Sequence, residues 1–247
     1  MNPIPLRYLS SRKIELMARD SLYRTSFLMA FSNIVSAGCG FFFWIVAARL
    51  YSVEEVGLAT ALISSLALVA LFAALGFDSS IIRFLPLEDK RKVISTGLIV
   101  TTGTSILAGG IFILLARILT PSMPLWQEPG YYLAFILIAV LNSIAVNCGY
   151  IFVADRKAEL YFLQNIMQAI RIPALLPLTF LGVFGILGSI GLGHLAAAFF
   201  SLAKIQMAIS QINLQVDREF ISKSFRFSFL NYLSSLLYAA PTLIMPI

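Results

Sequence analysis

The chain has 247 residues, of which 59% are hydrophobic and 12% charged, and its net charge is +6. An ordinary soluble domain is about one quarter charged, so a chain this apolar has too few polar residues to cover a water-facing surface. The basic residues lie in short segments between apolar runs, which is typical of membrane topology, so we expect no nucleic-acid partner.

The first part of the chain predicts a surface segment followed by a membrane span. Residues 1–24 mix basic and apolar side chains, which predicts either a short amphipathic helix at the membrane surface or a disordered tail. The apolar run at 26–48 is longer than the apolar region of a signal peptide. We therefore interpret it as a retained first span, because about 20 apolar residues are needed to cross the hydrocarbon core.

Two further spans are predicted in the next seventy residues. Ser52 and Glu55 have the spacing of a capping box, in which each side chain binds the backbone amide of the other residue at a helix start. This pattern predicts that a second span begins here and runs over about 55–76. We expect a polar loop at 77–92, rich in charged residues at its end, and a third span at about 93–116.

The second half of the chain predicts three more spans. The fourth, at about 131–154, follows a proline-rich loop and begins with two tyrosines, at the depth of an aromatic belt. The fifth, at about 160–181, is interrupted by Pro173 and Pro177, which have no backbone N–H to donate. We expect a glycine-rich turn at 182–188, and then a sixth span.

The last apolar run starts near Phe227 and stops at Ile247, so we expect only the beginning of a seventh span. The predicted fold class is an all-α polytopic transmembrane helix bundle. We divide the chain into a cytoplasmic amphipathic segment, a six-helix transmembrane lobe, and a cytoplasmic connector with the incomplete seventh span, at residues 1–24, 25–206 and 207–247.

The positions of the basic residues predict the orientation. Every lysine and arginine except Arg49, Arg117 and Arg171 falls in the N-terminal segment, in an even-numbered loop or after the sixth span. Short cytoplasmic loops carry an excess of basic residues. We therefore predict a multi-pass protein of the cytoplasmic membrane with a cytoplasmic N-terminus, and a missed span would have broken this alternation.

Small residues at four-residue spacing predict where helices pack closely, because in lipid close packing drives helix association. The first span has a short series, Ser32, Ser36 and Gly40, for which chance is the alternative. The sixth span has an unbroken series of five such positions: Gly185, Ser189, Gly193, Ala197 and Ser201.

Arg171 is the sharpest functional signal. It lies about 15 Å into the fifth span at 1.5 Å per residue, close to the midplane. A charge there costs about 2.5–3.5 kcal/mol on insertion scales and usually faces the bundle interior or a wet cavity. If the helix starts later, the side chain could instead snorkel to the interface. Interrupted helices near the midplane often form transporter sites, although proline also occurs in membrane helices without a role.

Other polar residues inside the apolar runs are less specific. Asn33, Asn142 and Asn147 could bind a sugar or a neighbouring helix. His194 is more typical of a packed, hydrogen-bonded residue than of a ligand. The two cysteines lie inside apolar runs and predict buried free thiols. With one histidine and two separated cysteines we expect no metal and no cofactor.

The acidic residues exclude some functions. All of them lie in predicted loops or at span ends, so the predicted spans contain no carboxylate for coupling to protons or sodium. Paired carboxylates, a metal cluster or an activated nucleophile would indicate a membrane enzyme, and we find none of these. We therefore expect a protein that is not an enzyme.

Two segments resemble the polysaccharide and O-antigen flippases, relatives of the multidrug and toxin extruders and the lipid II flippases. Residues 47–57, Ala-Ala-Arg-Leu-Tyr-Ser-Val-Glu-Glu-Val-Gly, resemble their first loop. Residues 76–86, Gly-Phe-Asp-Ser-Ser-Ile-Ile-Arg-Phe-Leu-Pro, resemble their loop after span two, and Asn33 and the turn at 182–186 also fit. The resemblance implies two lobes that rock around a central cavity, of which this chain contains the first lobe and part of span seven.

The resemblance implies a flippase that moves a lipid-linked oligosaccharide diphosphate across the cytoplasmic membrane for polysaccharide biosynthesis. Its partners would be membrane lipid, this substrate and other membrane proteins of glycan assembly. Arg171 would pair with phosphate. Arg24 and Arg83 would attract the headgroup at the cytoplasmic mouth and Arg49 would act near the outer gate, unless these three are topology anchors. The alternatives are a multidrug extruder, a membrane enzyme of glycan assembly or a membrane scaffold.

Overall fold

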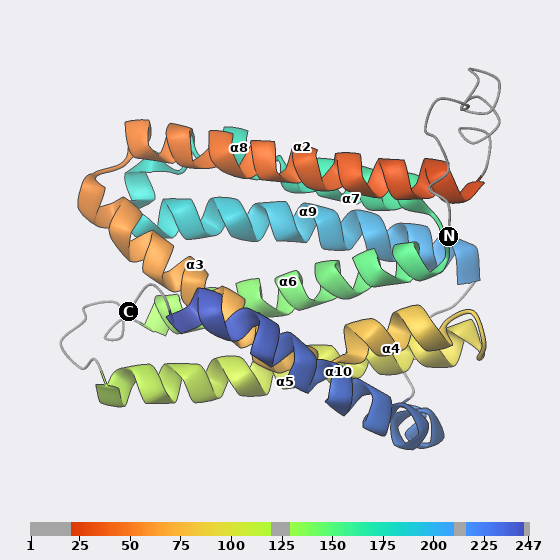
Figure 1. The fold of residues 1–247 in the computed structure, drawn as a ribbon. Helices are drawn as coiled ribbons and strands as arrows, with labels where there is room; N and C mark the ends of the chain where they lie inside the picture. Colours follow the sequence, from red (N-terminus) through yellow and green to blue (C-terminus); the bar gives the residue numbers. More distant parts are fainter. Residues whose placement is uncertain (1–20, 120–128, 210–215, 245–247) are drawn as a thin grey trace, which may run out of the picture.

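Long helices that run side by side make up the protein (Figure 1). The computed structural model describes residues 21–119, 129–209 and 216–244. Within these ranges, five helices are long and apolar enough to cross a membrane. They are α2 (Ser21–Leu50), α3 (Val53–Ala74), α5 (Lys90–Leu119), α6 (Pro129–Ala154) and α9 (Val183–Ile209). The predicted all-α polytopic membrane helix bundle is confirmed, while most of the predicted surface segment at 1–24 and the proline-rich loop lie outside the described residues.

The capping box predicted at the start of the second span is confirmed. Ser52 Oγ accepts a hydrogen bond from the backbone N–H of Glu55 at 3.3 Å, and the Glu55 carboxylate accepts from the N–H of Ser52 at 2.8 Å. Two amides at the start of α3 therefore have partners. The tight turn also places the Tyr51 hydroxyl where it donates to the carbonyl of Leu175 at 3.0 Å.

The loop predicted at 77–92 is wrong over its first half. Helix α3 ends where Leu75 and Gly76 adopt left-handed conformations, with φ angles of 45° and 72°. A second helix, α4 (Phe77–Phe84), then continues in the bundle (Figure 1). The second span is therefore a long helix with a break, and the loop begins only after α4.

Helix α4 stays in the bundle because it has an apolar face. The buried apolar side chains recur at helical spacing, at Phe77, Ile81 and Phe84. Gly76, just before α4, lets α10 (Arg218–Ile244) approach: a Cβ at position 76 would lie 2.1 Å from the carbonyl oxygen of Ser228. Position 76 therefore requires glycine for its φ angle and for this close contact.

The fifth predicted span is a broken helix, as its two prolines indicated. It consists of α7 (Ala158–Gln168), α8 (Arg171–Ala174) and a 3-10 turn, η3 (Thr179–Leu181). Pro173 has no N–H for the carbonyl of Ala169, which instead accepts from Ile172 at 3.0 Å. Pro177 acts in the same way, and the carbonyl of Pro173 accepts from Leu176 at 3.3 Å. At each proline, the carbonyl group four residues earlier therefore accepts a hydrogen bond from the residue three positions after it, as in a 3-10 helix.

The turn predicted at 182–188 is shorter than expected. Gly182 has a positive φ of 56°, and α9 begins at the next residue. Gly185 is helical, and a Cβ there would lie 2.1 Å from the carbonyl oxygen of Leu178. Residues 183–188 are therefore helical, and Gly185 permits a close approach of two backbones.

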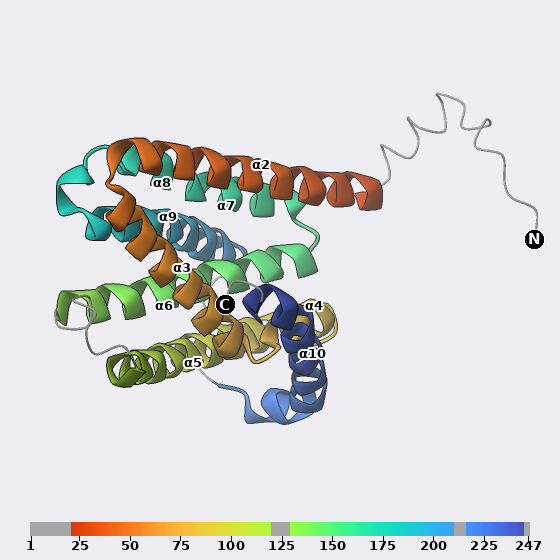
Figure 2. The same cartoon turned by 60° about the vertical axis from the view of Figure 1, so that its left-hand side comes forward.

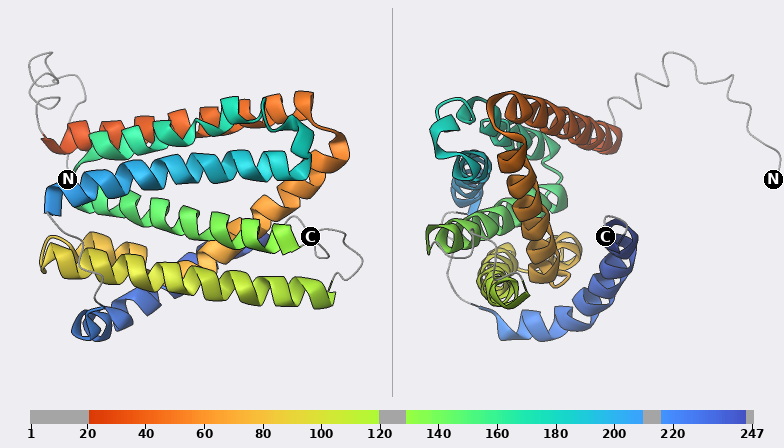
Figure 3. Two further views of the ribbon diagram at one scale, coloured as in Figure 1. Left: turned by 180° about the vertical axis from the view of Figure 1, so that it is seen from behind. Right: turned by 90° about the vertical axis from the view of Figure 1, so that its left-hand side faces the viewer.

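The predicted series of small residues is the packing face of α9, which lies beside α7 (Figure 3). All five positions are buried: Gly185, Ser189, Gly193, Ala197 and Ser201. The shorter series in α2 is mixed. Ser32 is buried and accepts a hydrogen bond from the amide of Asn165 at 2.7 Å, whereas Ser36 and Gly40 are half-buried.

One end of the bundle, which we call the basic end, gathers the start of α2, the turn after α6, the end of α9 and the start of α10 (Figure 1). Arg49 and Arg117 lie in the last turns of α2 and α5, at the opposite end. Four ion pairs join segments of the basic end: Arg24–Glu159, Lys90–Asp155, Lys92–Asp217 and Lys223–Glu88. A fifth, Lys157–Asp155, lies within the turn after α6. The alternation predicted from the basic residues is therefore present in the fold.

Helix α10 begins earlier than the predicted seventh span and crosses the bundle against α4 and α5 (Figure 2). The hydroxyl oxygens of Ser80 and Ser228 lie 2.5 Å apart at the contact with α4. The sixth span reaches Ile209, three residues past the predicted lobe boundary.

The apolar core is divided along the bundle. One cluster lies between α2, α3, α6 and α9, toward the end opposite the basic end, and includes Phe43, Leu62, Phe135 and Ile186. The other lies between α4, α5 and α6 near the basic end and includes Ile81, Ile94, Cys148 and Phe152. The predicted buried thiol is confirmed for Cys148, whereas Cys39 is half-buried.

Candidate functional site

Arg171 lies at the break between α7 and α8, between α2 and α9. Its guanidinium carbon Cζ lies 5.4 Å from the ring centroid of Phe43 in α2. The guanidinium also lies beside Gly40, one turn earlier, where an added Cβ would be in ordinary contact with Arg171 Nη2 at 3.6 Å. On the other side, a Cβ at Gly193 of α9 would lie 3.2 Å from Arg171 Cβ. The lack of a side chain at Gly193 therefore helps to accommodate the arginine.

Three helices indicate the depth of Arg171. Its neighbour Gly40 lies ten residues before the end of α2, and Gly193 lies ten residues after the start of α9. Both are therefore about 15 Å from the end opposite the basic end. Arg171 itself lies 13 residues after the start of α7, or about 20 Å from the basic end. For a hydrocarbon core about 30 Å thick, these distances place Arg171 near the midplane.

Two buried nitrogen atoms of Arg171 and His194 lack a hydrogen-bond partner. Among the described residues, no carboxylate forms an ion pair with Arg171. Its Nε is buried without a hydrogen-bond partner, and so is Nδ1 of His194. The prediction that His194 is a packed, hydrogen-bonded residue and not a ligand stays a prediction. Buried polar atoms without partners are costly, so this pair marks a candidate binding site.

The site can bind an anion. The guanidinium of Arg171 presents a planar fork of N–H donors that fits two oxygens of a phosphate or carboxylate group. The imidazole of His194 can donate or accept one further hydrogen bond. In the part of the chain that the structure describes, no group of His, Cys, Asp and Glu side chains could hold a metal ion.

Two of the three asparagines predicted to line the pathway take part in different helix contacts. The amide of Asn147 donates to Thr101 Oγ1 at 2.9 Å, which joins α5 and α6. Asn33 Oδ1 accepts from the Tyr161 hydroxyl at 3.4 Å, which joins α2 and α7. Asn142 is half-buried in α6. Asn147 and Asn33 thus form hydrogen bonds between helices, which was the alternative to sugar binding that the sequence left open. The role of the three asparagines in a substrate pathway stays a prediction.

The other predicted pathway arginines are not brought to Arg171. Arg24 forms its ion pair with α7 at the basic end. Arg83, in the last turn of α4, lies over the ring of Phe227, with 4.4 Å between its Cζ and the ring centroid. Arg49 is exposed at the opposite end. Their roles at the two mouths of a pathway stay predictions.

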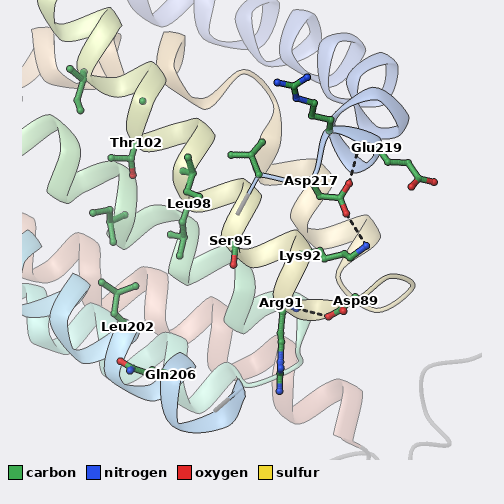
Figure 4. A pocket seen from close by; sticks show the side chains of 16 residues that line it. Asp89, Arg91, Lys92, Ser95, Leu98, Thr102, Leu202, Gln206, Asp217 and Glu219 are labelled. Carbon is green, nitrogen blue, oxygen red and sulfur yellow. Dashed lines mark hydrogen bonds and ion pairs between the residues drawn. The ribbon is translucent and has the colours of Figure 1, made fainter. Parts of the chain in front are cut away.

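A pocket with a volume of about 1410 Å³ lies at the basic end, between α5, α6, α9 and the start of α10 (Figure 4). One part of its wall is apolar and includes Leu98, Ile99, Ile106, Ile144 and Leu202. The other part is charged: Asp89, Arg91, Lys92, Asp217, Arg218 and Glu219. The pocket is therefore amphipathic, with its charges at the end of the bundle.

Two acidic groups of this pocket already have hydrogen-bond or ion-pair partners within the protein. Asp217 accepts from the backbone N–H of Phe220 at 3.1 Å and pairs with Lys92 at 3.0 Å. These two contacts, the Phe220 amide first, hold the pKa of Asp217 below its ordinary value. Asp89 accepts from the backbone N–H of Arg91 at 2.9 Å (Figure 4).

The guanidinium groups of Arg91 and Arg218 remain available in this pocket. Neither forms an ion pair with the described residues, and both are exposed. Sequence reasoning counted them only as markers of topology. The feature that the two arginines share is their position at the start of a helix that begins at the basic end.

The fold and site define a multi-pass, all-helical membrane protein with an arginine at mid-depth beside a helix break. Comparisons with protein-family models, with curated proteins and with solved structures found no match. The function must therefore be argued from the chemistry of the site.

Proposed function

We propose that this protein is a flippase that translocates a lipid-linked oligosaccharide across the cytoplasmic membrane. The observation that carries the proposal is Arg171, a cation near mid-depth with a buried, unpartnered Nε and no acidic partner among the described residues. A charge at this depth is costly in lipid, so it belongs to a site where it meets water or an anion. The diphosphate of the substrate supplies that anion.

The pocket at the basic end supports the same substrate class. A lipid-linked oligosaccharide combines a phosphate headgroup with a long apolar chain. Arg91 and Arg218 offer guanidinium groups for phosphate, while the apolar wall of the pocket extends along α5. The excess of basic residues supports a cytoplasmic position for this end.

The resemblance of residues 47–57 and 76–86 to polysaccharide and O-antigen flippases also supports the proposal. A multidrug extruder is the main alternative. Its cationic substrates would be repelled by Arg171, and no described carboxylate pairs with that arginine. A membrane enzyme of glycan assembly would need a catalytic cluster, and no acidic group lies against Arg171 and His194 in the described ranges to form one.

The test is transport of a fluorescent lipid-linked oligosaccharide in vesicles that contain the full-length protein. Arg171→Ala should slow transport by about 10- to 100-fold, because a hydrogen bond to a charged group contributes about 1.5–3 kcal/mol. Arg171→Lys keeps the charge but not the planar fork, so it should retain part of the activity. Arg117→Ala, which removes an arginine from the end of α5, is the control and should transport normally. An unchanged rate in folded Arg171→Ala protein would refute the proposal.

A further inference from the structure

The pocket at the basic end follows one face of α5. Its lining residues on that helix recur at helical spacing, at Arg91, Ser95, Leu98, Thr102 and Ile106. Helix α6 packs against both α5 and α9, and the pocket lies between these two helices. The pocket is therefore a groove that runs along the bundle with α6 as its floor, and we call it the α5–α9 groove.

The polarity of the α5–α9 groove changes along its length. On α5, Arg91 and Ser95 lie at the basic end, and Leu98 is the next lining residue inward. On α9, Gln206 lies three residues before the end of the helix, and Leu202 lies one turn further in. Both walls thus pass from polar to apolar side chains with depth, in the order of a lipid headgroup and its chain.

The polar part of the groove offers donors that have no acceptor. Ser95 is 1% exposed, and its Oγ has no hydrogen-bond partner. Arg91 forms no ion pair with the described residues. In Figure 4, both side chains extend from α5 on the side of Gln206. A buried hydroxyl without a partner is costly, and a phosphate group can accept hydrogen bonds from a hydroxyl and a guanidinium at once.

The apolar part of the groove has room for a hydrocarbon chain. A Cβ added at Gly103 would meet no neighbouring atom within 4 Å, so the protein's own side chains do not fill the groove at this position. Ile106, the last lining residue of α5, is 47% exposed. A lipid chain in the groove would cover this part of α5.

The length of the groove matches one leaflet of a membrane. Ile106 lies 15 residues after Arg91, or about 22 Å along the helix. A bilayer with its headgroup regions is about 40–45 Å thick, so one leaflet is about 20–22 Å. A phospholipid has its phosphate at one end of this distance and the ends of its chains at the other. The groove therefore fits a phospholipid of the leaflet at the basic end.

The charges of the lining suit a ligand that arrives from the membrane. Three lining residues are basic and three are acidic, so the groove as a whole is neutral. A neutral lining does not attract a soluble polyanion over a distance. A single phosphate in contact with Arg91 still gains a charge-assisted hydrogen bond.

We propose that the α5–α9 groove binds a membrane phospholipid, with its phosphate at Arg91 and Ser95 and an acyl chain along α5 as far as Ile106. This inference goes beyond the proposed function, because the phospholipid is held by the protein and not transported. A glycolipid that enters the same groove has to displace the phospholipid, and this last step alone rests on the proposed function.

The test titrates the purified protein in detergent with dioleoyl phosphatidylglycerol and follows the bound lipid by native mass spectrometry. A single molecule should bind saturably. Arg91→Gln should weaken this binding about tenfold, since it removes a hydrogen bond between charged groups. Arg117→Gln, which changes an exposed arginine at the other end of α5, is the control and should bind the lipid normally.

A second pair of variants tests the apolar part of the groove. Gly103→Leu fills the open position and should weaken lipid binding about tenfold or more, because the acyl chain and the leucine side chain would overlap. Gly110→Leu is the matched control on the same helix. An added Cβ there also meets no neighbouring atom within 4 Å, but Gly110 does not line the groove, so this variant should keep the affinity. Equal lipid binding by the two leucine variants and the unmodified protein would refute the proposal.

A third arm separates the phospholipid from the glycolipid substrate. Farnesyl diphosphate replaces phosphatidylglycerol as the probe of a prenyl diphosphate lipid. If farnesyl diphosphate binds in a way that depends on Arg91 and phosphatidylglycerol does not bind saturably, the groove is a substrate site and the proposal is wrong. Arg171→Ala should bind phosphatidylglycerol like the unmodified protein. No arm measures transport, so failure here and failure of the flippase assay are separate results.

Discussion

Substitution of Gly193 by alanine tests whether α9 positions Arg171. A Cβ at position 193 would lie 2.9 Å from the carbonyl oxygen of Gln168, the last residue of α7, and 3.2 Å from Arg171 Cβ. The first distance is too short for an ordinary carbon–oxygen contact, and the oxygen belongs to the backbone. It cannot be relieved by a side-chain rotation, so α7 and α9 must separate at the helix break.

The magnitude follows from two opposing terms. Overpacking of this kind costs about 1–3 kcal/mol. Replacing a helical glycine by alanine alone contributes about 0.5–1 kcal/mol of stability. Gly188→Ala on the same helix gains the second term without the first, because its Cβ would meet only the Leu178 side chain at 3.6 Å. The two variants should therefore differ by the overpacking term, about 1–3 kcal/mol.

The assay is thermal unfolding of both variants in the same detergent, together with the vesicle transport assay. For a chain of this size, 1 kcal/mol corresponds to about 2–4 °C, so Gly193→Ala should melt about 2–12 °C below Gly188→Ala. It should also transport more slowly, because Arg171 is displaced with α8. Equal melting temperatures would mean that α9 does not pack on the break as described.

Three further predictions concern contacts that hold the bundle together. Asn147→Leu removes the hydrogen bond to Thr101 between α5 and α6 and should lower stability by about 0.6–1.7 kcal/mol, measured by thermal unfolding in detergent. Ser52→Ala removes the cap of α3 and should lower stability by about 1 kcal/mol in the same assay. Burial alone would raise the pKa of Asp155, but hydrogen bonds from two lysines outweigh it and lower the pKa. The stability difference between the unmodified protein and Asp155→Asn should therefore be complete above 3.8, the ordinary pKa, and shrink as pH falls below it.

Each of these predictions has a result that would contradict it. Asn147→Leu would count against the interhelical bond if it melted at the temperature of the unmodified protein. For the cap, Ser64→Ala on the exposed face of α3 is the control, and equal effects of the two serine variants would contradict the capping argument. For Asp155, a stability difference that grows as the pH is lowered would reverse the predicted sign.

The sequence determined the span pattern well because it depends on local composition. Apolar runs of sufficient length, the capping box at Ser52 and Glu55, and the small residues of the sixth span are all short-range signals. The break in the fifth span was also predictable, because Pro173 and Pro177 remove backbone donors wherever they occur in a helix. Counting residues along that span predicted Arg171 about 15 Å in, and the helix bounds put it about 20 Å from the basic end.

The errors arose where polar residues interrupt an apolar period. Phe77, Ile81 and Phe84 have helical spacing, but the serines and charges between them led to a loop assignment for α4. In the same way, the glycines at 182–188 indicated a long turn, although Gly185 is needed for the approach of two backbones. Whether a polar or small residue serves a loop or a helix contact depends on its tertiary neighbours, which a single sequence does not show.

The surroundings of the two charges inside the bundle also required the structure. Asp78 lies in the first turn of α4, where the helix dipole is positive and favours its negative charge. Arg171 lies between the end of α7, where the dipole is negative, and the first residue of the short helix α8. An unbroken helix at either position would surround the charged side chain with backbone N–H and C=O groups that are already hydrogen-bonded to each other. The breaks at Gly76 and Pro173 thus lower the cost of placing ionisable side chains inside the bundle.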